Sequence, residues 1–79
     1  MNQKQDIHDL QATLARQIRA LRVERGISQE TLALAADVDR TYISQLERGI
    51  ANPSLLILWR IAEALEAELN LALMKKDSE

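Results

Sequence analysis

The stretch of the chain with the clearest chemical implication is residues 29–48. Ala33 is small enough to let two helices approach closely, Val38 can fill a turn between them, and the angle that the helices enclose can be filled by Leu32, Ile43 and Leu46. This spacing predicts two short helices joined by a tight turn, which would hold the second helix where it can enter a groove of DNA. The chemistry expected of this stretch is therefore DNA binding.

Catalytic chemistry finds little support in the residue types. His8 is the only histidine, and it lies near one end of the chain without a serine or cysteine nucleophile, a cluster of metal ligands or a glycine-rich phosphate loop beside it. Asp6 and Asp9, which flank it, suit the start of a helix. We therefore expect no enzyme activity, no metal site and no cofactor.

Length and composition favour one helical domain over residues 1–79. Hydrophobic residues make up 47% of the chain and charged residues 28%, with one Trp, one Tyr and no Phe, which suits packed helices rather than sheets. A core of this size gives modest stability, so association with a second copy would help. There is no cysteine, no apolar run near the roughly 18 residues of a membrane span, and no apolar secretory signal at the polar start. A cytoplasmic location without a membrane partner is the expectation.

Apolar spacing and helix caps predict four helices, over residues 7–25, 29–36, 40–48 and from 55 onward. The buried stripes of the first and fourth helices are expected at Ile7, Leu10, Leu14, Ile18 and Leu21 and at Leu55, Leu58, Ile61, Ala62 and Leu65. The predicted N-caps are Asp6 or Asp9, Ser28, Asp39 and Ser54. Gly26 should end the first helix, Asp37 should take a positive φ in the turn, and residues 1–6 should fray.

The charge of the chain is unevenly distributed. A formal net charge of −2 argues mildly against nucleic acid, because such domains are usually basic. Residues 10–60, however, hold seven arginines against five acidic residues, while residues 61–79 hold two lysines against five. The excess of acid therefore lies at the end away from the predicted DNA-binding stretch.

The segments Gly-Ile-Ser-Gln-Glu-Thr-Leu-Ala, Asp-Arg-Thr-Tyr-Ile-Ser-Gln-Leu-Glu-Arg-Gly and Asn-Pro-Ser-Leu resemble the lambda-repressor-like (Cro-type, XRE) helix-turn-helix family over roughly residues 10–66. The resemblance implies a mainly α fold with four core helices. Asp37 departs from the glycine usual in the family, which should add some strain to the turn. Apolar residues at Leu56, Ile57 and Trp59 are a second departure, because relatives often carry polar groups at some of these places.

The resemblance also implies the DNA contacts. The helix beginning at Arg40 would lie in the major groove, with base contacts from Arg40, Thr41, Ser44 and Gln45. Phosphate contacts are implied for Gln29, with Tyr42, Arg48 and Asn52 as weaker candidates whose alternative is an exposed polar residue without a role. Arg22 and Glu47 match an ion pair that ties the first helix to the end of the recognition helix; the alternative is two exposed side chains pointing apart.

A homodimer interface is expected at Leu56, Ile57, Trp59, Leu69, Leu71 and Leu73. The first three cannot all face the core, so some must form an exposed cluster, unless a monomer tucks Trp59 against the first helix. Residues 67–79 would form a dimerisation segment and a loose tail. Alternation of leucines with other residues over 68–74 predicts a strand that pairs across a two-fold axis, while residue propensity favours a short fifth helix.

Two classes of function follow from these features. The first is a homodimeric regulator of transcription that binds a near-palindromic double-stranded operator, such as a phage-type repressor, a restriction-modification controller, or an antitoxin with a toxin partner encoded nearby. The second is a helical protein-interaction module that has lost DNA binding. Groove-reading side chains on one face of residues 40–45 favour the first class.

Overall fold

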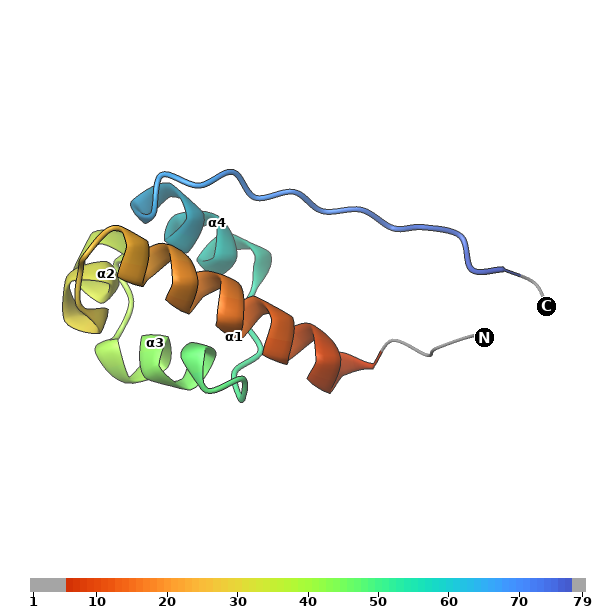
Figure 1. The fold of residues 1–79 in the computed structure, drawn as a ribbon, viewed down its shortest axis with the longest axis horizontal. Coiled ribbons are helices and arrows are strands. Elements are labelled where there is room, and N and C mark those ends of the chain that lie inside the picture. Colours follow the sequence, from red (N-terminus) through yellow and green to blue (C-terminus); the bar gives the residue numbers. More distant parts are fainter. Residues whose placement is uncertain (1–5, 78–79) are drawn as a thin grey trace.

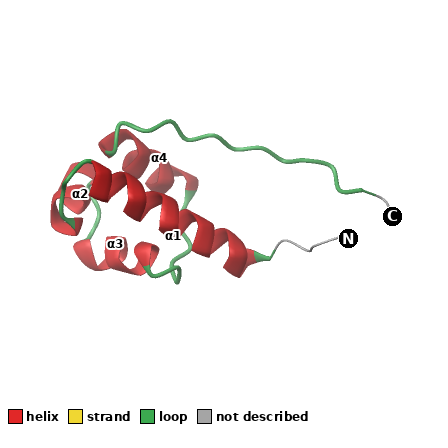
Figure 2. Ribbon diagram, viewed as in Figure 1, coloured by secondary structure: helices red, strands yellow, loops and turns green. Residues whose placement is uncertain are grey.

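Four α-helices form the described part of the chain, residues 6–77, in this computed structural model. They are α1 (Ile7–Glu24), α2 (Gln29–Ala36), α3 (Arg40–Glu47) and α4 (Leu55–Ala64) (Figure 1). Loops and turns make up the rest of residues 6–77, which contain no strand (Figure 2). The mainly α, four-helix core predicted from the sequence is confirmed.

Local hydrogen bonds explain most of the helix boundaries. The side chains of Asp6, Ser28 and Ser54 accept from backbone amides three residues later, at 2.9, 3.0 and 3.1 Å, and so cap α1, α2 and α4. Asp6 is therefore ordered by its cap rather than frayed, and the remaining residues predicted to fray, 1–5, lie outside the described residues. Asp39 occupies the predicted N-cap position of α3, but its side chain makes no capping hydrogen bond. Helices α1 and α3 each end one residue earlier than predicted.

The core lies where α2 meets α3 and α4, with α1 packed across α3. Its most deeply buried side chains are Leu32, Ile43, Leu46 and Ile61. Ala33 and Ala36 are also buried, and Val38 packs against the cluster from the turn. Small alanines let α2 approach its neighbours, as the spacing of residues 29–48 predicted. The packing thus fixes α3 relative to the other three helices.

Three residues predicted to be buried are exposed. Ile7 and Leu10 lie in the first turns of α1, which extend beyond the other helices (Figure 1), and Leu55 is the first residue of α4. The predicted apolar faces of α1 and α4 do turn toward the core, but they continue beyond the ends of the helices that pack against them. Periodicity identifies the face of a helix and does not say how far along the helix that face is covered.

Residues 67–77 contain no fifth helix, so that alternative is wrong. Glu66 takes a positive φ of 55°, and the Ala67 amide donates to the Ala62 carbonyl at 2.8 Å, which closes α4. Arg25 Nη2 lies 2.7 Å from Glu66 Oε2 and ties this turn to the end of α1. From there residues 67–77 run in extended form alongside α1 and past its first turn (Figure 1). Pairing of this segment as a strand stays a prediction.

Candidate nucleic-acid interface

The apolar side chains of α3 pack into the core, which leaves the polar side chains on its outward face. Ile43 and Leu46 are buried, and residues on the opposite side of a helix with 3.6 residues per turn must face outward. Arg40, Thr41 and Gln45 are exposed, and Ser44 is partly so. The structure therefore places the four residues predicted for base contacts on an accessible stretch of one helix.

The turn before α3 is held in a left-handed conformation. Asp37 has φ 59° and ψ 49°, as predicted, and the Val38 amide donates to the Ala33 carbonyl at 3.0 Å. An aspartate tolerates left-handed backbone angles better than most other residues that carry a Cβ. The turn and the packing of Val38 together set the direction in which α3 leaves α2.

An ion pair joins α1 to the end of α3. Arg22 Nε lies 2.6 Å from Glu47 Oε2, and Arg22 Nη2 lies 3.0 Å from Glu47 Oε1, so the guanidinium holds the carboxylate with two bonds. A third bond runs from Arg22 Nη1 to the Ile27 carbonyl at 2.9 Å. Only 12% of the Arg22 side chain and 2% of the Glu47 side chain are exposed, so the two charges do not point apart into solvent.

The pair changes the ionisation of both groups. Burial raises the pKa of the Glu47 carboxyl, but hydrogen bonds from Arg22 and Gln29 and the positive charges of Arg22 and Arg19 outweigh burial, so the pKa lies below its ordinary value. The hydrogen bond to Glu47 raises the pKa of Arg22 above its ordinary value against the opposing effect of burial. Both groups are therefore charged at neutral pH.

Gln29, the predicted phosphate ligand, is part of the same network. Its Nε2 donates to Glu47 Oε1 at 3.1 Å, and the residue is partly buried at the start of α2. Each amide nitrogen carries two hydrogens, so one donor of Gln29 remains for another acceptor. The sequence identified Gln29 and Glu47 separately, but their contact joins α2 to α3 and was not predicted.

The weaker phosphate candidates lie in different surroundings. Tyr42 packs partly against the core, and Arg48 is exposed directly after α3. Asn52 is exposed, and its Oδ1 accepts from Gln11 Nε2 at 2.7 Å, while the same nitrogen lies 3.0 Å from the Ala51 carbonyl. Gln11 was not among the residues predicted for this site. A signal existed, because Gln11 continues the buried stripe through Ala15 and Ile18, and a polar residue on such a stripe usually has a hydrogen-bonding partner.

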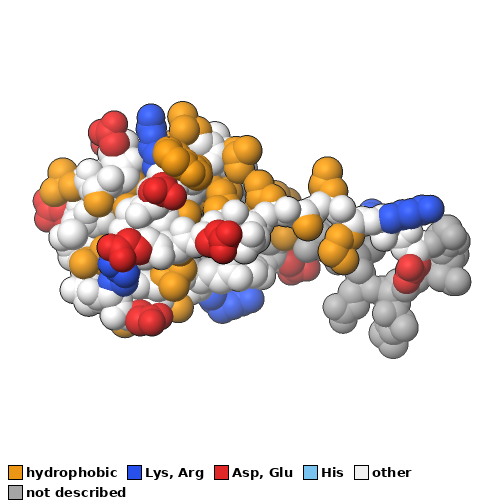
Figure 3. All heavy atoms as spheres, turned by 90° about the horizontal axis from the view of Figure 1, so that it is seen from above, with side chains coloured by type: hydrophobic (Ala, Val, Ile, Leu, Met, Phe, Trp, Pro, Cys, Tyr) orange, Lys and Arg blue, Asp and Glu red, His pale blue; other side chains and the backbone are white. Residues whose placement is uncertain are grey.

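Away from α3, apolar side chains gather over α4 and continue along the C-terminal segment (Figure 3). Leu55, Leu56 and Trp59 are exposed by 59, 55 and 53%. Ile57 instead packs partly against the core, so the exposed cluster contains Leu55 in its place. The alternative in which Trp59 is tucked against the first helix is wrong, because more than half of the side chain is open to solvent.

A helix-turn-helix family model, HTH_3, matches residues 18–71, more than half of the chain. The chain belongs to this family. The XRE-type resemblance predicted from the sequence is confirmed, and the relatives are named as regulators of transcription and as controllers of restriction-modification systems.

Three relatives illustrate the match. The Neisseria hypothetical transcription factor from Neisseria meningitidis serogroup B is 45% identical over 60 residues, which are 76% of this chain and 57% of that protein. Control protein C.BamHI from Bacillus amyloliquefaciens is 37% identical over 59 residues, 73% of each chain. The crystal structure of the restriction-modification controller C.AhdI from Aeromonas hydrophila superimposes with a TM-score of 0.72 at 40% identity, covering 73% of this chain and 88% of that one. The chain thus spans little more than half of the Neisseria protein and most of the controllers.

No helix within residues 6–77 is both long and apolar enough to cross a membrane. Nor do three or more histidine, cysteine, aspartate or glutamate side chains come together there in a way that could hold a metal ion.

Proposed function

We propose that the chain is a sequence-specific transcriptional regulator that binds double-stranded DNA as a homodimer, with α3 in the major groove. The observation that carries the proposal is the exposed polar face of α3, held by a buried apolar face and a fixed turn in a member of a helix-turn-helix family. It acts by binding rather than by catalysis, and the cytoplasm is the compartment in which it meets its operator.

The side chains on α3 have the chemistry to discriminate bases. Arg40 can donate two bonds to O6 and N7 of guanine, Gln45 can bond N6 and N7 of adenine, and the methyl group of Thr41 can contact a thymine methyl. Ser44 can donate to or accept from either kind of base. Arg40 also stands at the helix start, where a cation opposes the helix dipole, and a guanine partner would offset that unfavourable placement.

Backbone contacts would set the register of these base contacts. Gln29 supplies an amide donor at the start of α2, directly beside the Arg22–Glu47 pair that joins α1 to α3. Asn52 accepts from Gln11 through its oxygen, so its amide nitrogen is directed elsewhere and can donate to a phosphate. Tyr42 and Arg48 flank the α3 face and complete the proposed set.

A homodimer would give the protein enough contact with DNA for selectivity. Two copies on a near-palindrome would place their α3 helices in successive major grooves about 34 Å apart. Leu56 and Trp59 on α4, with Leu69, Leu71 and Leu73 in the segment after it, form the proposed interface, and Ile57 contributes from its partly buried position. An exposed apolar cluster of this kind usually marks an interface.

Within this class, we favour a controller that regulates its own operon. The chain covers 88% of C.AhdI and 73% of C.BamHI, so the match to these named controllers extends over most of their lengths. Solved structures of another controller, C.Esp1396I, include variants at an arginine, a threonine and a tyrosine in consecutive positions. The same tripeptide stands here at Arg40, Thr41 and Tyr42.

The test is selection of binding sites from a randomised DNA pool by the full chain. We expect enrichment of a near-palindrome with half-sites about one helical turn apart, and a gel-shift affinity that falls as salt rises because phosphate contacts release counterions. The DNA upstream of the chain's own gene is the second probe, and a controller should bind it with the selected site's affinity. Absence of any enriched sequence would contradict the proposal and favour the protein-interaction module.

A further inference from the structure

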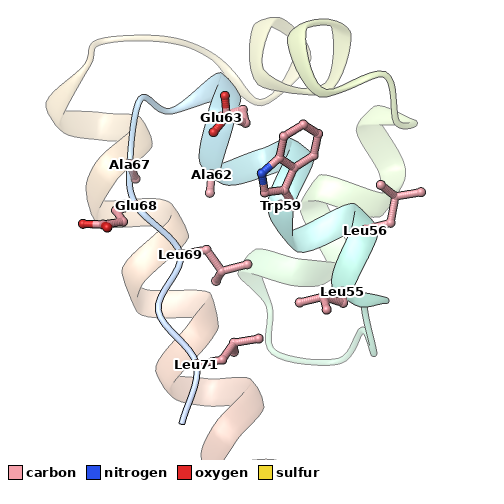
Figure 4. Close-up of a pocket in the computed structure, with 9 residues that line it drawn as sticks. All are labelled: Leu55, Leu56, Trp59, Ala62, Glu63, Ala67, Glu68, Leu69 and Leu71. Carbon is pink, nitrogen blue, oxygen red and sulfur yellow. The ribbon is translucent and has the colours of Figure 1, made fainter.

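An apolar groove lies between α4 and the extended C-terminal segment (Figure 4). It has a volume of about 630 Å³, and Figure 4 shows Leu69 and Leu71 directed toward α4 from the segment. The opposite wall and floor are formed by Leu55, Leu56, Trp59 and Ala62. Three of these wall residues are more than half exposed, so the chain's own segment fills the groove only in part.

The segment has two chemically different sides. In an extended chain, alternate residues face opposite sides, so Leu69, Leu71 and Leu73 share one side. Leu69 is partly buried, Leu71 is exposed and Leu73 is fully exposed. The apolar side of the segment therefore continues beyond the part that the chain itself can cover, and its unpaired backbone can accept another strand.

We propose that the segment of a second copy pairs with this one as an antiparallel two-stranded ribbon whose two-fold axis passes through Leu71. This register follows from the side chains. Leu71 lies opposite its own counterpart, and Leu69 lies opposite Leu73 of the other copy, so every leucine on the apolar side meets a leucine. On the other side, Lys76 becomes the diagonal neighbour of Glu68, a distance that long side chains can bridge.

Neighbouring registers lose these matches. With the axis at Asn70, Leu73 would face Ala67 beside the turn that ends α4. With the axis at Ala72, Lys75 would lie opposite Leu69 and put an ammonium group against the apolar groove. With the axis at Leu71, both lysines lie beyond the leucines, and Lys75 lies opposite Ala67 at the end of the groove that the acidic residues Glu63 and Glu68 also line.

The same pairing supplies the missing occupant of the groove. Both strands of such a ribbon present their leucines to the same side, so Leu73 of the second copy lies beside Leu69, over Leu55, Leu56 and Trp59. The inference rests on the homodimer in the proposed function, and it specifies the residues that face one another in that dimer. It also accounts for the alternation of residues 68–74, which the closed helical core does not use.

Disulfide trapping tests the register, since the chain contains no cysteine and an introduced one is the only thiol. Directly opposed strand residues have Cα atoms within the range that a disulfide accepts. We expect Leu71→Cys to form a linked dimer on mild oxidation, resolved on a non-reducing gel. Leu69→Cys and Leu73→Cys should each stay unlinked alone, because like positions are then about 13 Å apart along the strands, but an equal mixture of the two should link.

Linking of Leu69→Cys or Leu73→Cys alone, or no linking of Leu71→Cys, would overturn the register. All three positions lie in the extended segment outside the core, so circular dichroism should show folded variants. DNA binding is scored separately by gel shift with the same proteins. If Leu71→Cys forms the linked dimer but binds no DNA, the proposed function is contradicted and the ribbon is supported. If the variants bind DNA but do not link as expected, only the ribbon is contradicted.

Trp59, the only tryptophan, reports occupation of the groove. As the concentration of the full chain rises, its emission should shift to shorter wavelength when leucine side chains of the second copy displace water. Leu73→Asp should abolish this shift, because a carboxylate would be placed against the groove. Met74→Gln, on the other side of the segment and opposite Glu68 of the second copy, adds a polar group without a like charge, so it is the control and should retain the shift. A shift that survives Leu73→Asp would overturn the proposed occupant.

Discussion

At the scale of single residues, Arg40 is the side chain expected to contribute most to sequence preference. Arg40→Ala should weaken binding to a selected operator by about 1–3 kcal/mol and relax the preference at one base pair in each half-site, because a bidentate contact with guanine is lost. Titrations by fluorescence anisotropy with the operator and with single-base variants would measure both effects.

The control for Arg40 is Arg16→Ala, which removes an exposed arginine of α1 whose guanidinium donates to the Thr13 hydroxyl. It should leave the base preference unchanged. Gln29→Ala should weaken binding to all DNA sequences to the same extent, since a phosphate contact carries no base information. Unchanged operator affinity in Arg40→Ala would show that α3 does not read the groove as proposed.

At the scale of elements, the Arg22–Glu47 pair links α1 to α3, and its contribution to stability should depend on pH. The Glu47 pKa is lower in the folded chain than in the unfolded chain, so the unfolded chain binds the proton more readily. The stabilisation is therefore complete above the ordinary glutamate pKa of about 4.3, and it is lost as pH falls through the lower folded value.

Glu47→Gln isolates this contribution. The substitution keeps the shape of the side chain but leaves the largely buried Arg22 without a counter-charge. It should therefore lower the free energy of unfolding by about 3 kcal/mol at pH 7. Urea unfolding of both proteins, followed by circular dichroism at several pH values, should show the difference shrinking below about pH 4.3. A difference that stays constant down to the acid limit would contradict a charged pair.

The turn between α2 and α3 offers a second test of an element. Asp37 holds a left-handed conformation that costs a residue with a Cβ on the order of 1 kcal/mol, so Asp37→Gly should stabilise the fold by up to about that amount. Gly26→Ala is the matched opposite change. Gly26 has φ +69° with nothing within 4 Å of the position that a Cβ would occupy, so its cost of about 1 kcal/mol reports backbone strain alone.

Denaturant unfolding midpoints of the two turn variants should therefore move in opposite directions. Specific DNA binding by Asp37→Gly should be close to that of the native chain, because packing of Val38 and Ile43 also holds α3 in place. Destabilisation by Asp37→Gly would mean that the aspartate side chain contributes more than its backbone conformation costs.

At the scale of the whole molecule, removal of residues 71–79 should convert the dimer to monomers. The truncation leaves Ala67 and Leu69 against α1 and α4 but removes Leu71 and Leu73, which the core does not cover. Operator binding should weaken because the two half-sites are no longer bound jointly. Sedimentation at micromolar concentration measures the mass, and thermal unfolding should show that the four helices remain folded. An unchanged dimer mass would place the interface elsewhere.

The sequence by itself determined the features that depend on neighbouring residues. The caps at Ser28 and Ser54, the positive φ of Asp37 and the inward face of α3 were all predicted, since each is decided within about one helical turn. The Arg22–Glu47 pair was available only through resemblance to a family, because 25 residues separate its members.

The tertiary structure decided what depends on residues far apart in the chain. Exposure of Leu10 and Leu55 follows from where other helices end, and periodicity carries no such information. The bonds from Gln29 to Glu47 and from Gln11 to Asn52 span 18 and 41 residues. The direction of residues 67–77 is set at Glu66, which has a left-handed conformation and pairs with Arg25. The residue types of this segment favour a helix, but Ala67 and Leu69 can pack on α1 and α4 only if α4 ends before them.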